Sequence, residues 1–295
     1  MELKEIKSKI DSVRNIWKLT GALETLSALK MKKAQKIALL SRPFAEKTAQ
    51  FLEEMESNFG AEQSVFFKKS ETGKVLMLVL ASDRGFCGSF NSNVLKFAEK
   101  EINEIKNANE IELLPVGKKA ITFFKNRGYA AKYNFFGIGD YGELEDTKSI
   151  SDFLVSGFLQ GKYKEVLLFY TDFISTFLQK PKKVKLLPAS KENLKDFLRD
   201  AGITADSNKQ HEFIVEPSRQ ILLETIVPQL IEYLIYQAIL EGNASEHSAR
   251  MMAMRNAADN AREKVTELNF AYNKARQEQI TKEVCEVSSA KEVLD

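Results

Sequence analysis

Both ends of this chain carry long runs of apolar residues spaced alternately three and four positions apart, and this spacing restricts the fold more than any other feature. At the N-terminus the spaced positions are Leu3, Ile6, Ile10, Val13 and Trp17. Residues 1–58 contain one proline and one glycine, so little interrupts a helix there. Such spacing over so long a segment is typical of a coiled coil rather than of an ordinary globular helix.

Near Trp17 the apolar spacing moves by one position. It resumes at Ile16, Leu19, Leu23 and Leu26, with Lys30 and Lys33 at the next two positions and Ile37, Leu40 and Phe44 after them. We therefore predict a phase slip and a polar interruption in the seam of the first helix. The lysines predict a basic collar that faces solvent or a protein partner.

The C-terminal end shows a matching pattern. Its apolar positions are Met251, Met254, Ala258, Ala261, Val265, Leu268, Tyr272 and Ala275, followed after a skipped residue by Ile280, Val284 and Val287. The spacing predicts a helix from about 221 to 287, in which Pro228 forms a kink or belongs to the first turn. One long amphipathic helix at each terminus predicts an antiparallel pair that forms a rod, built from residues 1–58 and 216–295.

Residues 59–215 have a different pattern, which predicts a globular α/β domain. Apolar runs of strand length occupy 74–82, 111–117, 165–173 and 183–189, and segments with helical spacing occupy 91–105 and 149–161. Strands that alternate with helices predict a largely parallel sheet covered by helices. The polar segment 198–213 is expected to be a long connection.

The segment ASDRGFCGSF, residues 81–90, joins the first predicted strand to the first predicted helix, where many proteins bind phosphate. Its glycines are spaced G-x-x-G, and the lysine of a phosphate loop is missing. We therefore favour a structural turn or a subunit contact, with Asn91 as helix cap and a local ion pair or hydrogen bond between Asp83 and Arg84. The residues that shape this turn are Asp83, Arg84, Gly85 and Gly88.

No group of residues in the sequence suggests catalysis or a metal site. The 43 basic and 41 acidic side chains leave a formal net charge of +2, which gives no reason to expect a nucleic-acid partner. The two cysteines, Cys87 and Cys285, follow no metal-ligand spacing, and neither His211 nor His247 suggests a Cys–His pair. We expect no catalytic residue, no metal and no cofactor.

Four separated stretches resemble the gamma subunit of F-type ATP synthases, in its bacterial form. They are EIKSKIDSVRNIWKLTGALETLSALKMKKAQ at the start, SDRGFCGSFN in the middle, ASEHSARMMAMRNAADNA, and LNFAYNKARQEQITKEVCEV near the end. The resemblance runs from end to end in the expected order. It implies a long antiparallel coiled coil of the terminal helices plus a central Rossmann-like α/β domain.

The resemblance also implies a function. The coiled coil would be the central rotor shaft inside a hexamer of alternating alpha and beta subunits, where catalysis and nucleotide binding take place. The globular domain would contact the epsilon subunit and the ring of c subunits. Rotation driven by ion flow would change the beta subunits in sequence to make ATP. Such a subunit is peripheral, on the cytoplasmic face of the bacterial inner membrane, and reaches the membrane only through its complex.

Carried over residue by residue, the resemblance also implies contacts with the hexamer. The residues expected to catch the surrounding loops are Arg276, Gln277, Thr281 and Glu283. Arg250, Lys30 and Lys33 are expected to face acidic elements of beta lower on the shaft.

The chain also departs from the family pattern. Its tail reads SSAKEVLD where members usually end in small apolar residues, so Lys291, Glu292 and Asp295 place charge at the tip. Gly21 stands where a helix former is usual, at a cost of up to about 1 kcal/mol. Two other functions stay open from the residues alone: a stand-alone coiled-coil scaffold with an α/β head, and a nucleotide-binding α/β enzyme.

Overall fold

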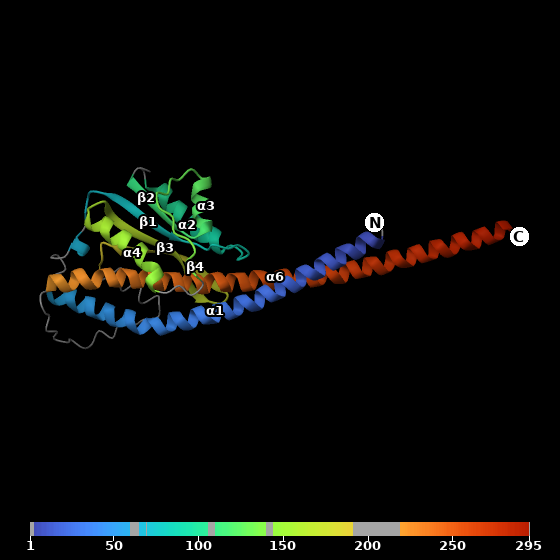
Figure 1. The fold of residues 1–295 in the computed structure, drawn as a ribbon, viewed down its shortest axis with the longest axis horizontal. Helices are drawn as coiled ribbons and strands as arrows, with labels where there is room; N and C mark the ends of the chain where they lie inside the picture. The colour runs from blue at the N-terminus through green and yellow to red at the C-terminus, as the bar shows by residue number, and fades with distance from the viewer. Residues whose placement is uncertain are drawn as a thin grey trace. The chain divides into compact units, whose positions relative to one another are not determined.

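The computed structural model describes residues 3–59, 65–68, 70–105, 110–139, 144–190 and 219–294 (Figure 1). The chain divides into two compact units, one of Met1–Ser27 with Arg250–Asp295 and the other of Ala28–Ala249. We call the first the helix-pair unit and the second the sheet unit. The predicted domain bounds at 58/59 and 215/216 stay predictions. The described residues do not include segment 198–213 with His211, or the side chains of Phe44, Lys291, Glu292 and Asp295.

Two long helices contribute to both units, as the terminal heptads predict. Helix α1 spans Leu3–Phe59 and helix α6 spans Arg219–Leu294. Their 57 and 76 residues correspond to about 85 Å and about 115 Å at 1.5 Å per residue. Pro43 lies inside α1, and Pro228 lies inside α6 rather than in its first turn. Across the described residues, no helix has an apolar stretch long enough to cross a bilayer.

In the helix-pair unit, α1 and α6 run side by side in opposite directions (Figure 1). Ile6 and Ile10 of α1 are buried, as are Met254, Ala258 and Ala261 of α6. The spacing of these residues confirms the predicted antiparallel seam. The alanines leave little side-chain volume between the helices, which favours a short distance between their axes.

The predicted phase slip in α1 is wrong. After Trp17, which is 40% exposed, the buried positions keep the first spacing and are Thr20, Ser27, Met31, Ala34 and Ala38. Thr20 and Ser27 can be buried because their hydroxyls donate to helix carbonyls, at 2.9 Å to Ile16 O and 2.7 Å to Leu23 O. The alternative apolar positions face outward: Ile16 is 52% exposed and Leu19 is 61% exposed.

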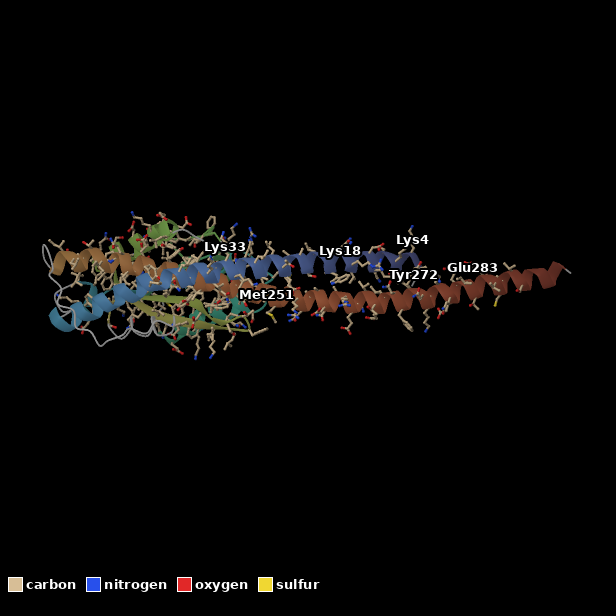
Figure 2. All side chains as sticks on the ribbon, turned by 90° about the horizontal axis from the view of Figure 1, so that it is seen from below. Lys4, Lys18, Lys33, Met251, Tyr272 and Glu283 are labelled. Atoms are coloured by element: carbon tan, nitrogen blue, oxygen red, sulfur yellow. The ribbon has the colours of Figure 1, made fainter. Side chains whose placement is uncertain are left out.

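The predicted seam of α6 also ends earlier than expected. Ile280, Val284 and Val287 are exposed instead of buried. Figure 2 shows the reason, because Lys4 near the start of α1 lies opposite Tyr272, whereas Glu283 lies beyond the end of α1. All side chains from residue 276 to 288 are exposed.

Among the described residues of the sheet unit, four strands form one sheet in the order β2-β1-β3-β4. The strands are β1 (Lys74–Leu80), β2 (Ile111–Val116), β3 (Tyr163–Ser175) and β4 (Leu178–Leu187). β1 pairs in parallel with β2 and with β3, and β4 pairs antiparallel with β3. This confirms the largely parallel sheet, although β4 begins at 178, before the predicted 183, because it forms a hairpin with β3.

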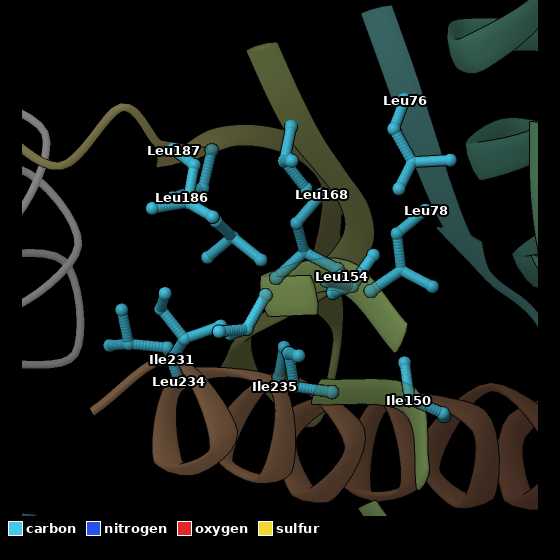
Figure 3. Close-up of a cluster of buried hydrophobic side chains, with 14 of the residues drawn as sticks. Leu76, Leu78, Ile150, Leu154, Leu168, Leu186, Leu187, Ile231, Leu234 and Ile235 are labelled. Carbon is cyan, nitrogen blue, oxygen red and sulfur yellow. The ribbon is translucent and has the colours of Figure 1, made fainter. Parts of the chain in front are cut away.

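Both faces of the sheet carry hydrophobic cores. One core joins Val75, Met77 and Val79 of β1 to α2 (Phe90–Glu104) and α3 (Lys118–Asn126). The other joins alternate residues of β1, including Leu76 and Leu78, to α4 (Leu144–Leu159) and to the first part of α6 (Figure 3). Successive strand residues point to opposite faces, so a strand buried on both sides is apolar throughout. A short 3-10 helix, η2 (Val65–Phe67), adds Phe66 to the second core.

Candidate functional site

The exposed end of α6, residues 276–288, carries the four residues expected to contact the hexamer. Arg276, Gln277, Thr281 and Glu283 are all exposed there. The Thr281 hydroxyl donates to Gln277 O at 2.9 Å, and Gln279 Nε2 donates to the Glu283 carboxylate at 2.8 Å. These bonds stay within the helix, so the polar side chains and their remaining hydrogen-bonding capacity face outward.

Three apolar residues that were predicted to lie in the buried seam of α6 are part of this exposed surface instead. With about 100° of turn per residue, the exposed residues Ile280, Val284 and Val287 share one side of α6. Arg276 and Glu283 border this apolar stripe on one flank, and Gln277 and Thr281 border it on the other. We call this surface the α6 tip stripe.

Helix α1 carries a second exposed apolar stripe. Ile16, Leu19 and Leu26 lie on one side, next to the buried seam, with Leu23 half-buried between them. We call this the α1 outer stripe. The sequence already indicated this stripe, because α1 has two adjacent rows of apolar residues and an antiparallel helix pair buries only one row.

The three predicted basic contacts differ in exposure. Lys33 is exposed and Lys30 is half-buried, and both follow the line of the α1 outer stripe along the helix. Arg250 is only 8% exposed. A guanidinium buried within its own chain is poorly placed to meet a partner, so this residue differs from the two lysines.

The turn after β1 is closed by Asp83. One carboxylate oxygen accepts a hydrogen bond from Lys118 N–H at 2.8 Å, and the other accepts one from Gly137 N–H at 2.9 Å. Asp83 thus joins the end of β1 to the start of α3 and to the loop at 137. The expected bond partner was Arg84, but the Asp83 carboxylate binds backbone N–H groups, and the Arg84 side chain is exposed.

Hydrogen bonds to the same turn also occupy the first N–H groups of α3. Lys118 N–H is bound to Asp83, and Lys119 N–H donates to Ser82 O at 3.0 Å. Gly117 lets α3 begin this close to β1, because a Cβ there would lie 2.0 Å from Ala81 O. The turn supplies its own carboxylate to the helix N-terminus.

Asn91 has a different role from the predicted cap. α2 begins at Phe90 with Ser89 as its cap residue, and the Ser89 side chain forms no cap bond. Asn91 instead accepts from Ser82 N–H at 2.9 Å and donates to Cys87 Sγ at 3.1 Å. Cys87 is buried beside this amide. The turn has positive φ at Gly88 and also at Phe86, whereas Gly85 is not among its positive-φ residues.

The ASEHSAR stretch of α6 anchors the β3–β4 hairpin, a role that sequence reasoning missed. Ser248 Oγ donates to Thr176 O at 2.5 Å, and Ser245 Oγ donates to Thr171 O at 3.4 Å. Gln179 Nε2 donates to Ser248 Oγ at 3.4 Å. Two serines three positions apart, on one face of the helix, are the signal that could have indicated this contact.

A buried carboxyl lies one turn earlier on α6. Glu241 accepts a hydrogen bond from Gln237 Nε2 at 3.1 Å. Burial, together with the nearby Asp172 carboxylate, raises the pKa of Glu241 to about 7. Within the described residues, no group of three histidines, cysteines or carboxylates is arranged to hold a metal ion.

Comparison with known proteins places this chain in a family. The family model described as ATP synthase matches residues 2–294. The ATP synthase gamma chain of Pelotomaculum thermopropionicum is 36% identical over 293 residues and is covered to 99%, as is this chain. The gamma chain of Chloroflexus aurantiacus is 37% identical over 295 residues, with 99% of this chain and 98% of the relative covered.

Solved structures agree with these relatives. The central stalk and c-ring structure of the Tetrahymena thermophila mitochondrial ATP synthase includes a chain with 27% identity and a TM-score of 0.61, covering 81% of this chain and 99% of that one. A chain of the Euglena gracilis enzyme has the same fold at 16% identity, with a TM-score of 0.64 and coverage of 99% and 94%. This chain belongs to the family of ATP synthase gamma chains.

Proposed function

We propose that this chain is the central rotor shaft of an F-type ATP synthase and that it contains no catalytic site of its own. The terminal helices turn inside a ring of alternating alpha and beta subunits, and the sheet unit contacts the epsilon subunit and the c ring. Ion-driven rotation of the ring thereby reaches the nucleotide sites of the hexamer. The observation that carries this proposal is the match to ATP synthase gamma chains over the whole length of both proteins.

A rotor acts on its surroundings only if it binds their successive conformations with different affinity. The two exposed stripes provide such a difference, because each occupies one side of its helix. As the shaft turns, an apolar side and a charged side would meet a given beta subunit in succession. The asymmetry therefore comes from the outer surface of the helices and not from a slip in their seam.

We assign the α6 tip stripe to the innermost contact with the hexamer. Ile280, Val284 and Val287 contact apolar parts of the surrounding subunits, while Gln277 and Thr281 exchange hydrogen bonds with their loops. Arg276 and Glu283 supply charges on the opposite flank. Lys30 and Lys33 meet acidic elements of beta. Arg250 acts indirectly, by holding α6 in place.

The same proposal places the protein at a membrane without inserting it. We infer a peripheral position on the cytoplasmic face of a bacterial inner membrane, held there by the c ring and epsilon. The turn at Asp83, Arg84, Gly85 and Gly88 serves as a structural turn within the sheet unit, which leaves Phe86, 77% exposed, at its surface for a subunit contact.

The test uses the chain assembled with its alpha and beta subunits and reconstituted into proteoliposomes. Replacing Gln277 and Thr281 with alanine removes one flank of the tip stripe. We expect coupled ATP synthesis to fall about fivefold or more, which corresponds to a coupling loss of about 1 kcal/mol. The helicity of the purified chain should stay unchanged, because the lost contacts are intermolecular.

The matched control is Lys282→Ala, which lies on the opposite side of α6 and also removes a polar exposed side chain. It should leave synthesis near the parent level. Equal losses in both variants would remove the tip stripe from the proposal. Tight binding of ATP by the purified chain without partners would favour a nucleotide-binding enzyme instead.

A further inference from the structure

The β3–β4 hairpin extends beyond the rest of the sheet. In the described part of the chain, Phe169 is the last residue of β3 that pairs with β1, whereas β3 stays paired with β4 as far as Ser175 opposite Leu178. We call residues 170–182 the ribbon. Two paired strands alone are marginally stable in water, so the ribbon needs a further contact to keep a fixed position. Helix α6 provides such a contact.

The side of α6 that meets the ribbon is polar although it is buried. Its buried polar residues are Gln237, Glu241, Ser245 and Ser248. With about 100° of turn per residue, these four share one side of the helix. Polar groups at buried positions add little net stability, because their hydrogen bonds replace bonds to water. Hydrogen bonds are directional, however, so they fix an angle between two elements that apolar packing alone leaves free.

Two hydrogen-bonded points join the ribbon to α6. At the first, Ser245 Oγ donates to Thr171 O at 3.4 Å, and at the second, Ser248 Oγ donates to Thr176 O at 2.5 Å. Gln179 Nε2 strengthens the second point, because it donates to Thr176 O at 2.9 Å and to Ser248 Oγ at 3.4 Å. Thr171 lies near the start of the ribbon and Thr176 lies in its turn. Attachment at two separated points resists rotation of α6 about its own axis, which a single point would permit.

We propose that this contact between the ribbon and α6 transmits rotation from the sheet unit to α6, with Ser248 and Gln179 as positioning residues for coupling. The inference rests on the function proposed above, in which the c ring turns the sheet unit and α6 acts on the hexamer. Along α6 the sheet unit ends at Ala249, the residue after Ser248. The contact therefore fixes the angle of α6 at the end of the sheet unit. Without it, part of the applied rotation is lost as α6 turns against the sheet.

A difference between two activities tests this proposal. The double variant Ser248→Ala with Gln179→Leu removes both side-chain donors to Thr176 O. Coupled ATP synthesis in proteoliposomes requires rotation to pass through the sheet unit, so it should fall about threefold to tenfold. ATP hydrolysis by the chain assembled with alpha and beta alone places no load on the sheet unit and should keep the parent rate. Unchanged synthesis, or an equal loss of both activities, would overturn the proposal.

Ser151→Ala is the matched control. Ser151 is also buried in the sheet unit, but its Oγ donates to Lys148 O at 3.0 Å, so that bond stays inside α4. The control should keep the parent rate of coupled synthesis. A loss as large as that of the double variant would mean that synthesis depends on the stability of the sheet unit and not on the ribbon contact.

Hydrogen exchange of backbone amides separates local loosening from unfolding of the whole sheet unit. In the double variant, amides of the ribbon should exchange about fivefold faster, because opening the ribbon no longer breaks the bonds to α6. Amides of β1 should exchange at the parent rate. Equal acceleration in β1 and in the ribbon would contradict a local contact and would overturn the proposal.

The variant with Gln277 and Thr281 replaced by alanine distinguishes this inference from the proposed function. It acts at the hexamer, so it should lower synthesis and hydrolysis together. If it lowers neither, the proposed function of the α6 tip stripe fails. If it lowers both while the double variant keeps full synthesis, only the role assigned to the ribbon contact fails.

Discussion

The two units of this chain use apolar residues in opposite ways. In the sheet unit, the apolar runs of the strands are buried, and Leu76, Leu78 and Leu154 are completely covered. In the helix-pair unit, Ile16 and Leu19 are more than half exposed, while Thr20 and Ser27 lie in the buried seam. Apolar character therefore predicts burial in the first case and fails to do so in the second.

This difference follows from the number of surfaces that each unit must cover. A sheet with helices on both faces buries both sides of every central strand. Two paired helices bury only one side of each helix, so any further apolar side stays exposed. Large exposed apolar surfaces on a soluble protein indicate contacts with other molecules. Under the proposed function, the buried seam holds the two helices together and the exposed stripes are the surfaces that contact partners.

The largest expected effect is the loss of a buried side chain from the sheet unit. Leu154→Ala removes a fully buried leucine from the core between β1, β3 and α6 (Figure 3). We expect the free energy of unfolding of the sheet unit to fall by about 2–5 kcal/mol. Urea unfolding followed by near-ultraviolet circular dichroism measures this change. The single tryptophan, Trp17, lies in the helix-pair unit and reports that unit separately by fluorescence.

The second-largest expected effect is a change with pH in the free energy of unfolding. Burial, with Asp172, raises the pKa of Glu241 from 4.5 to about 7. The folded state therefore binds this proton more tightly, so its contribution to stability is complete below about pH 4.5 and is lost as the pH rises to about 7. Over this window the parent should lose about 1–3 kcal/mol relative to Glu241→Gln. Urea unfolding at a series of pH values measures the difference, and parallel stability curves would contradict it.

A smaller effect is expected in the turn after β1. Asp83→Asn keeps the shape of the side chain but leaves one oxygen to accept two backbone hydrogen bonds. One N–H, of Lys118 or of Gly137, then loses its partner, which should cost about 1–2 kcal/mol. The comparison is Arg84→Ala in the same turn, which removes an exposed side chain and should change stability by less than about 0.5 kcal/mol. Equal effects in the two variants would mean that the Asp83 bonds do not support the turn.

The smallest effect on stability is expected in the α1 outer stripe. Leu19→Ser replaces a leucine that is 61% exposed, so the free energy of unfolding of the purified chain should change by about 0.5 kcal/mol or less. In the assembled enzyme the same variant should lower coupled ATP synthesis. A large loss of stability in the purified chain would show that the leucine is buried and would remove the distinction between the two units.

Much of the fold follows from the sequence by local rules. The terminal heptads predicted α1 and α6, and the apolar runs at 74–82, 111–117 and 165–173 predicted three parallel strands. These elements are long or strongly patterned, so neighbouring residues alone indicate them. The bonds of Asp83 and Ser248 were not predictable in this way. Their partners lie 35 and 72 positions away along the chain, and no local pattern records such distances.

The sequence by itself determined that long helices would form at both ends, that a largely parallel sheet would lie between them, and that the chain resembles a rotor subunit. Only the tertiary structure decided which of two adjacent stripes on α1 would be buried. Both stripes have the same three-and-four spacing, so each is an acceptable seam when the helix is considered alone. The choice depends on the partner helix, because burial of a side chain is decided by the surface that it meets and not by the spacing along its own helix.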